Sequence, residues 1–491
     1  MLFTLDCVGQ KHDAIWTLGY GSGFSTTGGF NIDFGQGSVK FDTINRPMDF
    51  LGTVGSICDS AGNLLFCCNG EYVADKNDQK MPNGDSLNIA WGAYGYGYPV
   101  PQGIIILQQP DTQNIYYIFH ICIEFNPVWS TTQIKGSLWY SVVDMTLNNG
   151  LGDVVIKNQR IIDGGLIPYS NLTACKHANG KDWWVVVPKK ESNGYYKVLF
   201  NKKGVELAAL QSVGDTIPEY HDGSGMSCFS PDGQKYAFYN TNTDLYLFDF
   251  NRCNGELYNF KHIPIHDTCD TYNCTTGIAF SPNSRFLYVS GYFYLYQIDL
   301  KPADTPYSII KLAELDYQLD TNMYLTAFCN PQLAFDKKIY ISTSTSSTYY
   351  YHVISSPDEP GVDCGFVMRG LQLPRLGGNE IPHFPNYRLG PVSNEYCDSL
   401  SVGTKNPVQN SSVAFSLWPN PAHSSFAFSR ESAENEGILR LFDANGRLYM
   451  TKTISEGANN IQVDVSTLSP GSYVVEFVCE QIIGHKKLVV Q

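Results

Sequence analysis

Two loops near the middle of the chain place histidine beside carboxylates. The first, IPEYHDGSG, contains His221 and Asp222, and the second, IPIHDTCDTYNC, contains His266, Asp267 and Asp270. Side chains of these types can bind a metal or act as general acid and base when a fold gathers them. His-Asp and Asp-Gly are also ordinary turn and capping residues. We therefore treat these residues as weak catalytic candidates and expect neither a metal nor a cofactor.

A glycine-rich stretch supplies a second kind of candidate. The segment WGAYGYGYP interleaves glycine with aromatic residues in what should be a loop. Rings exposed on loops can stack on sugars or anchor a protein partner. The candidate stacking residues are Trp91, Tyr94, Tyr96 and Tyr98. Packing of the rings into the core is the alternative, here and for the three tyrosines of STYYYH further along the chain.

Sequence motifs of known enzymes are missing. The chain contains no GxSxG, HExxH, Walker or dinucleotide-binding pattern. The stretch DKNDQKMPNGD resembles a calcium loop, but Lys80 stands at the sixth position, where an EF-hand requires glycine. Binding is therefore favoured over catalysis, and an enzyme with a His/carboxylate centre is the alternative.

Composition and charge narrow the class of protein. The chain of 491 residues is too long for one ordinary core, so we expect more than one domain. Its 33 basic and 47 acidic residues give a formal charge of -14, which argues against a nucleic-acid partner. The 13% aromatic content, 44 glycines and 25 prolines are typical of an all-β protein with many turns. No apolar run is long enough for a transmembrane helix.

Cysteine usage favours an oxidising, extracytoplasmic location, because 14 cysteines are many for a cytosolic protein of this length. Candidates for disulfide bonds are Cys253, Cys269, Cys274, Cys364 and Cys397. Buried free thiols are the alternative.

A repeat with a period of about fifty residues runs through the first four hundred. Its clearest copies are GIAFSPNSRFLYVSGYFYLYQIDL and MSCFSPDGQKYAFYNTNTDLYLFDF, each of which predicts strand, tight turn, strand, turn and strand. Six copies are recognisable, with turn residues Gly62, Asn114, Gly180, Gly233, Ser284 and Lys337.

This period predicts a β-propeller over residues 11–400, with six or seven blades. A seventh blade would form if strands near residues 15–20 and 30–34 paired with segment 366–373 or 382–389, since closure removes exposed edges. The FSPDG turn at residues 229–233 resembles the repeat signature of WD-like and TolB-like propellers. Glycine is lost from this turn in two copies, at Ser284 and Lys337, which leaves the turn type there open.

The end of the chain has a different composition. A polar linker at residues 401–412 precedes a tail, residues 413–491, that contains only two tyrosines, Tyr449 and Tyr473. Seven short alternating segments separated by turn residues predict a small immunoglobulin-like β-sandwich.

Four elements of the tail occur in order and carry a family resemblance. They are the PNP of Pro419, Asn420 and Pro421, a hairpin with Leu441, Asp443, Gly446 and Arg447, an LSPG ending at Gly471 before Tyr473, and KKLVVQ with Lys486 and Lys487. Together they resemble the type A C-terminal sorting domain that Bacteroidota attach to cargo of the type IX secretion system.

That resemblance implies export through the periplasm to the outer-membrane surface or beyond, with the secretion machinery as partner. The route requires a signal peptide, so we expect residues 1–10 to be the remnant of one. A terminal strand with basic residues would offer an edge for strand addition by a receptor. We expect a surface or secreted binding protein for a glycan or protein, with a propeller hydrolase or lyase as the alternative and a structural scaffold as a minor third.

Overall fold

The structure is a computed structural model of the chain. It describes residues 10–21, 28–50, 52–88, 97–125, 134–166, 171–217, 225–241, 243–265, 267, 276–301, 307–319, 324–344, 348–379, 381–392, 415–430, 436–443, 448–479 and 482–491. The chain divides into two compact units, Met1–Asp398 and Ser399–Gln491. None of the described segments forms a helix long and apolar enough to span a membrane.

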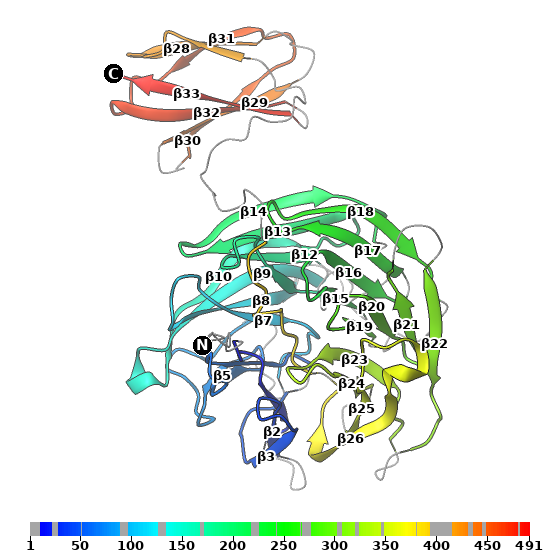
Figure 1. The fold of residues 1–491 in the computed structure, drawn as a ribbon. Helices are drawn as coiled ribbons and strands as arrows, with labels where there is room; N and C mark the ends of the chain where they lie inside the picture. The colour runs from blue at the N-terminus through cyan, green and yellow to red at the C-terminus, as the bar shows by residue number, and fades with distance from the viewer. Residues whose placement is uncertain are drawn as a thin grey trace, which may run out of the picture. The chain divides into compact units, whose positions relative to one another are not determined.

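The described part of the first unit forms seven antiparallel sheets in chain order (Figure 1). Two sheets have three strands each: β1 (Ile15–Gly19), β2 (Gly29–Asp33), β3 (Lys40–Ile44); and β4 (Gly55–Cys58), β5 (Leu64–Cys68), β6 (Val73–Asp75). The next two have four strands each: β7 (Ile104–Gln108), β8 (Ile115–Phe125), β9 (Ile134–Asp144), β10 (Asp153–Leu166); and β11 (Thr173–Lys176), β12 (Trp183–Pro188), β13 (Gly194–Asn201), β14 (Gly204–Ser212).

The remaining three sheets also have four strands each: β15 (Met226–Phe229), β16 (Lys235–Asn240), β17 (Asp244–Asn251), β18 (Glu256–Ile263); β19 (Gly277–Phe280), β20 (Phe286–Ser290), β21 (Tyr294–Asp299), β22 (Ser308–Glu314); and β23 (Phe328–Leu333), β24 (Ile339–Thr343), β25 (Thr348–Ile354), β26 (Phe366–Gly377). Two short 3-10 helices, η2 (Asn148–Gly150) and η3 (Gly361–Cys364), lie between strands.

The first strand of each sheet lies toward the middle of the unit, as Figure 1 shows for β7, β15, β19 and β23. We call these the inner strands and the space between them the channel. Because successive strands are antiparallel, the turns that follow the inner strands of the four-stranded sheets lie on one face of the ring. Strand β1 runs in the opposite direction to β4, since the His12 carbonyl before β1 accepts from the Cys58 N–H at the end of β4, so the chain enters β1 from this same face. In a four-stranded sheet the last strand ends on the opposite face, where the connection to the next inner strand begins. The first unit is a β-propeller.

The turns after β19 and β23 keep a left-handed residue although glycine is lost, whereas in the turn after β7 the left-handed residue is Asp111, with a φ of 59°, and not the expected Asn114. In the FSPDG copy, Gly233 has a φ of 71°, and its N–H donates to the Ser230 carbonyl at 2.8 Å. At the same place in later sheets, Ser284 has a φ of 61° and Lys337 a φ of 67°. The hairpin pairing around the turn, with Phe229 opposite Tyr236, is therefore built on the same backbone shape in all three.

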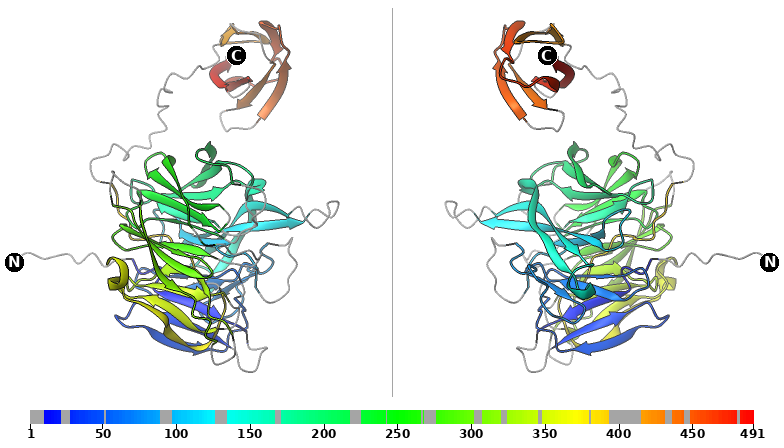
Figure 2. Two further views of the ribbon diagram at one scale, coloured as in Figure 1. Left: turned by 90° about the vertical axis from the view of Figure 1, so that its right-hand side faces the viewer. Right: turned by 90° about the vertical axis from the view of Figure 1, so that its left-hand side faces the viewer.

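The expected pairing of N-terminal strands with segment 366–373 or 382–389 is wrong. Strands β1, β2 and β3 pair with one another, β26 pairs with β25, and the described residues of 382–389 belong to no strand. The β1–β3 sheet instead packs beside the β23–β26 sheet, as the blue and yellow strands show in both views of Figure 2. Trp16 meets Tyr340 edge to face with ring centroids 6.0 Å apart, and the Arg375 guanidinium donates to the Ile44 carbonyl at 2.9 Å.

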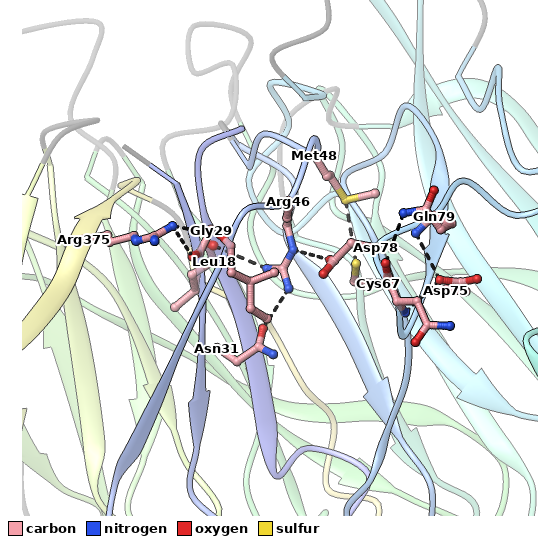
Figure 3. A network of polar contacts seen from close by, with 12 residues as sticks. Leu18, Gly29, Asn31, Arg46, Met48, Cys67, Asp75, Asp78, Gln79 and Arg375 are labelled. Atoms are coloured by element: carbon pink, nitrogen blue, oxygen red, sulfur yellow. Dashed lines mark hydrogen bonds and ion pairs between the residues drawn. The ribbon is translucent and has the colours of Figure 1, made fainter. Parts of the chain in front are cut away.

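Arg46 links the two three-stranded sheets (Figure 3). Its side chain is fully buried, and its Nε donates to Asp78 at 2.6 Å. Its Nη2 donates to the Asn31 side chain of β2 at 2.9 Å, and its Nη1 reaches the Leu18 carbonyl of β1 at 3.5 Å. A buried guanidinium is stable only when its donors are satisfied, so this network holds the connection after β3 in place.

The second unit is a small β-sandwich. One sheet contains β27 (Phe415–Trp418), β28 (Ser425–Arg430) and β31 (Asn460–Asp464). The other has the order β30 (Leu448–Ile454), β29 (Gly437–Asp443), β32 (Gly471–Cys479) and β33 (Ile482–Val490). Alternate residues of each strand point between the sheets, where Phe428 and Phe477 pack with ring centroids 4.8 Å apart.

Disulfide bonding differs in part from expectation. Cys253 is disulfide-bonded, whereas Cys364 is a buried free thiol, so its expected pairing is wrong. Cys269, Cys274 and Cys397 lie outside the described residues.

Candidate functional site

The PNP segment of the tail lies against the last strand of the chain. Asn420 Nδ2 donates to the Lys487 carbonyl at 2.7 Å, and Asn420 Oδ1 accepts from the Val489 N–H at 2.9 Å. The Ala422 N–H donates to the Val489 carbonyl at 2.7 Å, and its carbonyl accepts from the Gln491 N–H at 2.9 Å. We call these four bonds the latch. Because β33 is the edge strand of its sheet, the latch covers the C-terminal part of an otherwise open edge.

Exposed side chains surround the latch. Trp418, next to Pro419, is 76% exposed, the largest exposed fraction of any described aromatic side chain. Lys486 and Lys487 are exposed, and the Lys486 Nζ lies 5.7 Å from the centroid of the Phe415 ring. An aromatic ring and two ammonium groups therefore flank the place where β27 meets β33.

Tyr473 and its neighbours have structural contacts. The Tyr473 side chain is 6% exposed, and its hydroxyl donates to the Ser469 carbonyl at 2.8 Å. Asp443 lies opposite Tyr473 in the ladder between β29 and β32, and Gly471 lies opposite Val490 of the terminal strand. These three residues therefore hold the turn before β32 and its pairing with β33. Gly446 lies outside the described residues.

Of the weak catalytic candidates, the structure describes only Asp267. His221, Asp222, His266 and Asp270 lie outside the described residues. Asp267 is 1% exposed, and among the residues that the structure describes neither carboxylate oxygen has a hydrogen-bond partner of normal geometry. Burial raises the pKa of Asp267 to about 6, against the opposing effect of the nearby Tyr294 backbone N–H. A Cβ at Gly291 would overlap its Oδ2, so the carboxylate is closely packed.

Among the aromatic candidates the structure describes Tyr98. Its ring is 1% exposed, and its hydroxyl accepts from the Ile123 N–H at 2.6 Å. A ring in this position has no free face for stacking on a ligand, which is a correction to the expectation for Tyr98. Trp91, Tyr94 and Tyr96 lie outside the described residues. Further along, Tyr351 is buried, and Tyr349 and Tyr350 are half-buried.

Sequence reasoning missed an exposed group on the connection between β22 and β23. Tyr317 is 64% exposed, Leu319 is 48% exposed and Tyr324 is 44% exposed. A bridge between Leu319 and Leu325 brings the two arms of the connection together. Two tyrosines, a leucine and a methionine among the polar residues of the stretch DYQLDTNMY were the available signal. We call Tyr317, Leu319 and Tyr324 the apolar loop group.

Sequence reasoning also missed that residues 381–392, the channel segment, lie in the channel. The Tyr387 hydroxyl donates to the Ile106 carbonyl of β7 at 2.7 Å, and Asn386 Nδ2 donates to the Pro231 carbonyl after β15 at 2.7 Å. Arg388 forms a two-bond ion pair with Asp13, before β1, at 2.6 and 2.8 Å. The channel segment thus contacts residues of three different sheets, which are far apart in the sequence.

Comparisons with known proteins divide the chain in the same way. Residues 416–491 match the family model of the secretion system C-terminal sorting domain, and this part of the chain belongs to that family. The domain implies transport by the type IX secretion machinery to the cell surface or the extracellular space. No curated protein matches the chain.

Solved structures similar to the chain include β-propellers. The Dos1 propeller shares 14% identity, with 65% of this chain and 71% of that chain covered and a TM-score of 0.38. Sqt1 of Saccharomyces cerevisiae shares 12% identity, with 77% and 98% covered and a TM-score of 0.35. A functionally unknown protein from Desulfotomaculum acetoxidans shares 10% identity, with 75% and 99% covered and a TM-score of 0.40. These likenesses concern the fold alone.

Proposed function

We propose that this secreted propeller travels through the periplasm and binds an extracellular glycan or protein with one face of its ring. The binding face is the one that carries the connections into the inner strands. The observation that carries the proposal is the apolar loop group, in which Tyr317, Leu319 and Tyr324 expose about half or more of their side chains.

Exposed tyrosines suit this role for a physical reason. A tyrosine ring buries a large apolar area on contact, while its hydroxyl can bond to a polar partner, and few rotatable bonds are frozen. The connection exposes two such tyrosines, Tyr317 and Tyr324, together with Leu319. Asp267, a member of the alternative catalytic set, is buried and closely packed, so no described contact favours the enzyme alternative.

The test is binding of the full chain to a printed glycan array and to immobilised collagen, fibronectin and mucin. The double variant Tyr317→Ala/Tyr324→Ala should bind the recognised target at least about tenfold more weakly, as expected when two anchors are removed. Tyr258→Ala is the matched control, because Tyr258 is a tyrosine of similar exposure, 46%, on outer strand β18. Equal binding by the double variant and the control would refute the assignment of the face.

We infer in addition that the secretion receptor reads the tail at β33. The latch covers the outer edge of β33 from Lys487 to Gln491, so an added receptor strand would pair with the N-terminal half of β33 or displace the latch. Lys486 and Lys487 lie at the boundary between the two halves. Deleting residues 486–491 should trap the protein in the periplasm, and normal surface display of that truncated chain would contradict this inference.

A further inference from the structure

A hollow remains beside the channel segment. It has a volume of about 390 Å³ and is lined by inner strands β15, β19 and β23 and by residues of the channel segment. Figure 1 shows these three strands next to one another in the middle of the unit. Pro231, Pro282 and Lys337, from the turns that follow the inner strands, also line it. The hollow therefore opens on the face opposite the apolar loop group.

The accessible wall of the hollow is apolar. Four lining side chains are half-buried and present carbon to the cavity: Phe229, Leu333, Phe335 and Phe384. Ile278 and Phe280, which also line the hollow, are buried. Pockets for small molecules in proteins have volumes of about 300–1,000 Å³ and mostly apolar walls. The volume and the wall both match a small molecule with one or two rings.

One of the charged side chains at the hollow is a cation without an ion-pair partner among the described residues. The charged lining residues are Asp13, Lys337 and Arg388. Asp13 and Arg388 neutralise each other through their two-bond ion pair. The Lys337 side chain is exposed, and its Nζ has no hydrogen bond or ion pair among the described residues. The chain as a whole has a formal charge of -14, but the rim of the hollow carries a positive charge that would attract an anionic ligand.

We propose that this hollow binds a small molecule with an aromatic or aliphatic body and a single anionic group, such as an aryl or fatty carboxylate or sulfonate. The body fills the space between Phe229, Leu333 and Phe384, and the anionic group pairs with Lys337 at the rim. This site is independent of the proposed binding face, because the two lie on opposite faces of the ring.

The experiment uses two fluorescent probes with related ring systems. 8-Anilinonaphthalene-1-sulfonate carries one sulfonate, and N-phenyl-1-naphthylamine has the same rings without it. The full chain should bind both probes saturably with one site each. Leu333→Trp adds a larger ring system inside the hollow. It should weaken the binding of both probes at least about tenfold, because the indole fills the space that they occupy.

The charge is tested by Lys337→Gln, which alters an exposed turn side chain and leaves the fold intact. This variant should lower the affinity for the sulfonate probe about three- to tenfold and leave the affinity for the uncharged probe unchanged, since it removes only the ion pair with the sulfonate. Lys338→Gln is the matched control, because Lys338 is the next residue and does not line the hollow. No saturable binding by the wild-type chain, or sulfonate binding that is equal in the Lys337→Gln and Lys338→Gln variants, would overturn the proposal.

Discussion

Replacing Asp267 with asparagine should stabilise the propeller at neutral pH and change its stability little in acid. The ordinary pKa of an aspartate is about 4, whereas burial raises the pKa of Asp267 to about 6 in the folded protein. The folded state thus binds the proton more tightly than the unfolded state. The contribution of Asp267 to the free energy of unfolding is fully present below about pH 4, declines as the pH rises, and is lost above about pH 6.

The size of the effect follows from the difference between the two pKa values. Each pKa unit corresponds to about 1.4 kcal/mol, so two units make the ionised Asp267 cost about 3 kcal/mol at pH 7.5. Asparagine has nearly the same shape and no charge, so the variant avoids this cost. Among the described residues, the hydroxyls of Tyr239 and Tyr296 interact electrostatically with Asp267. Burial raises the pKa of both, that of Tyr296 to about 12, so neither changes charge in this range.

The assay is urea unfolding at pH 4 and pH 7.5, followed by tryptophan fluorescence, since every tryptophan except Trp418 lies in the first unit. Asp267→Asn should raise the free energy of unfolding by about 3 kcal/mol at pH 7.5 and by less than about 1 kcal/mol at pH 4. Asp42→Asn, a change at an exposed residue of β3, is the control. An equal effect of Asp267→Asn at both pH values would refute the reasoning.

Three further predictions concern the ion pair of Arg46 with Asp78, the latch, and the terminal lysines. Arg46→Met should lower the free energy of unfolding by about 3–5 kcal/mol, because it leaves Asp78 without its buried partner; a loss below about 1 kcal/mol in urea unfolding would contradict this. Asn420→Ala removes the acceptor of the Val489 N–H, so hydrogen exchange at that amide should become about fivefold faster, from the ~1 kcal/mol of one hydrogen bond. The Gln491 amide, which bonds to the Ala422 carbonyl, serves as internal control, and equal acceleration at both would count against a local role of Asn420. Lys486→Gln/Lys487→Gln should reduce the fraction of protein that external protease reaches on intact cells, while Lys452→Gln, an exposed lysine of β30, should not.

The repeat and its turns could be predicted from sequence because they are local. A Pro-Asp-Gly turn between two apolar runs specifies a hairpin, and Ser284 and Lys337 adopt the same left-handed shape without glycine. The channel segment could not be predicted, because its partners are far away in sequence: Tyr387 bonds to Ile106, and Arg388 to Asp13. The sequence offered residues 382–389 only as a possible closing strand, because a segment held by single side-chain bonds to distant residues has no periodic pattern that marks it.

The candidate site could also be predicted only in part. The four tail elements were recognisable as motifs, but the bonds from Asn420 to β33 were not, because an asparagine beside proline reads as an ordinary turn residue. The glycine-rich aromatic loop showed that rings were present without showing which of them point inward, and Tyr98 is buried. The apolar loop group was missed because isolated apolar residues in a polar stretch have no periodicity.

The position of the channel segment has a mechanical consequence. The last described residues of the first unit bond to the Arg252 side chain through the Gly390 carbonyl at 2.6 Å and to the Ala178 carbonyl through the Val392 N–H at 2.9 Å. Tension on the chain beyond Val392 therefore acts on these bonds, on the Tyr387 hydroxyl and on the Arg388 ion pair before it reaches β26. A load shared among such contacts resists rupture better than one that peels a sheet edge bond by bond. Traction on the tail would thus leave the last strand pair, β25 and β26, unloaded until the channel segment has been withdrawn.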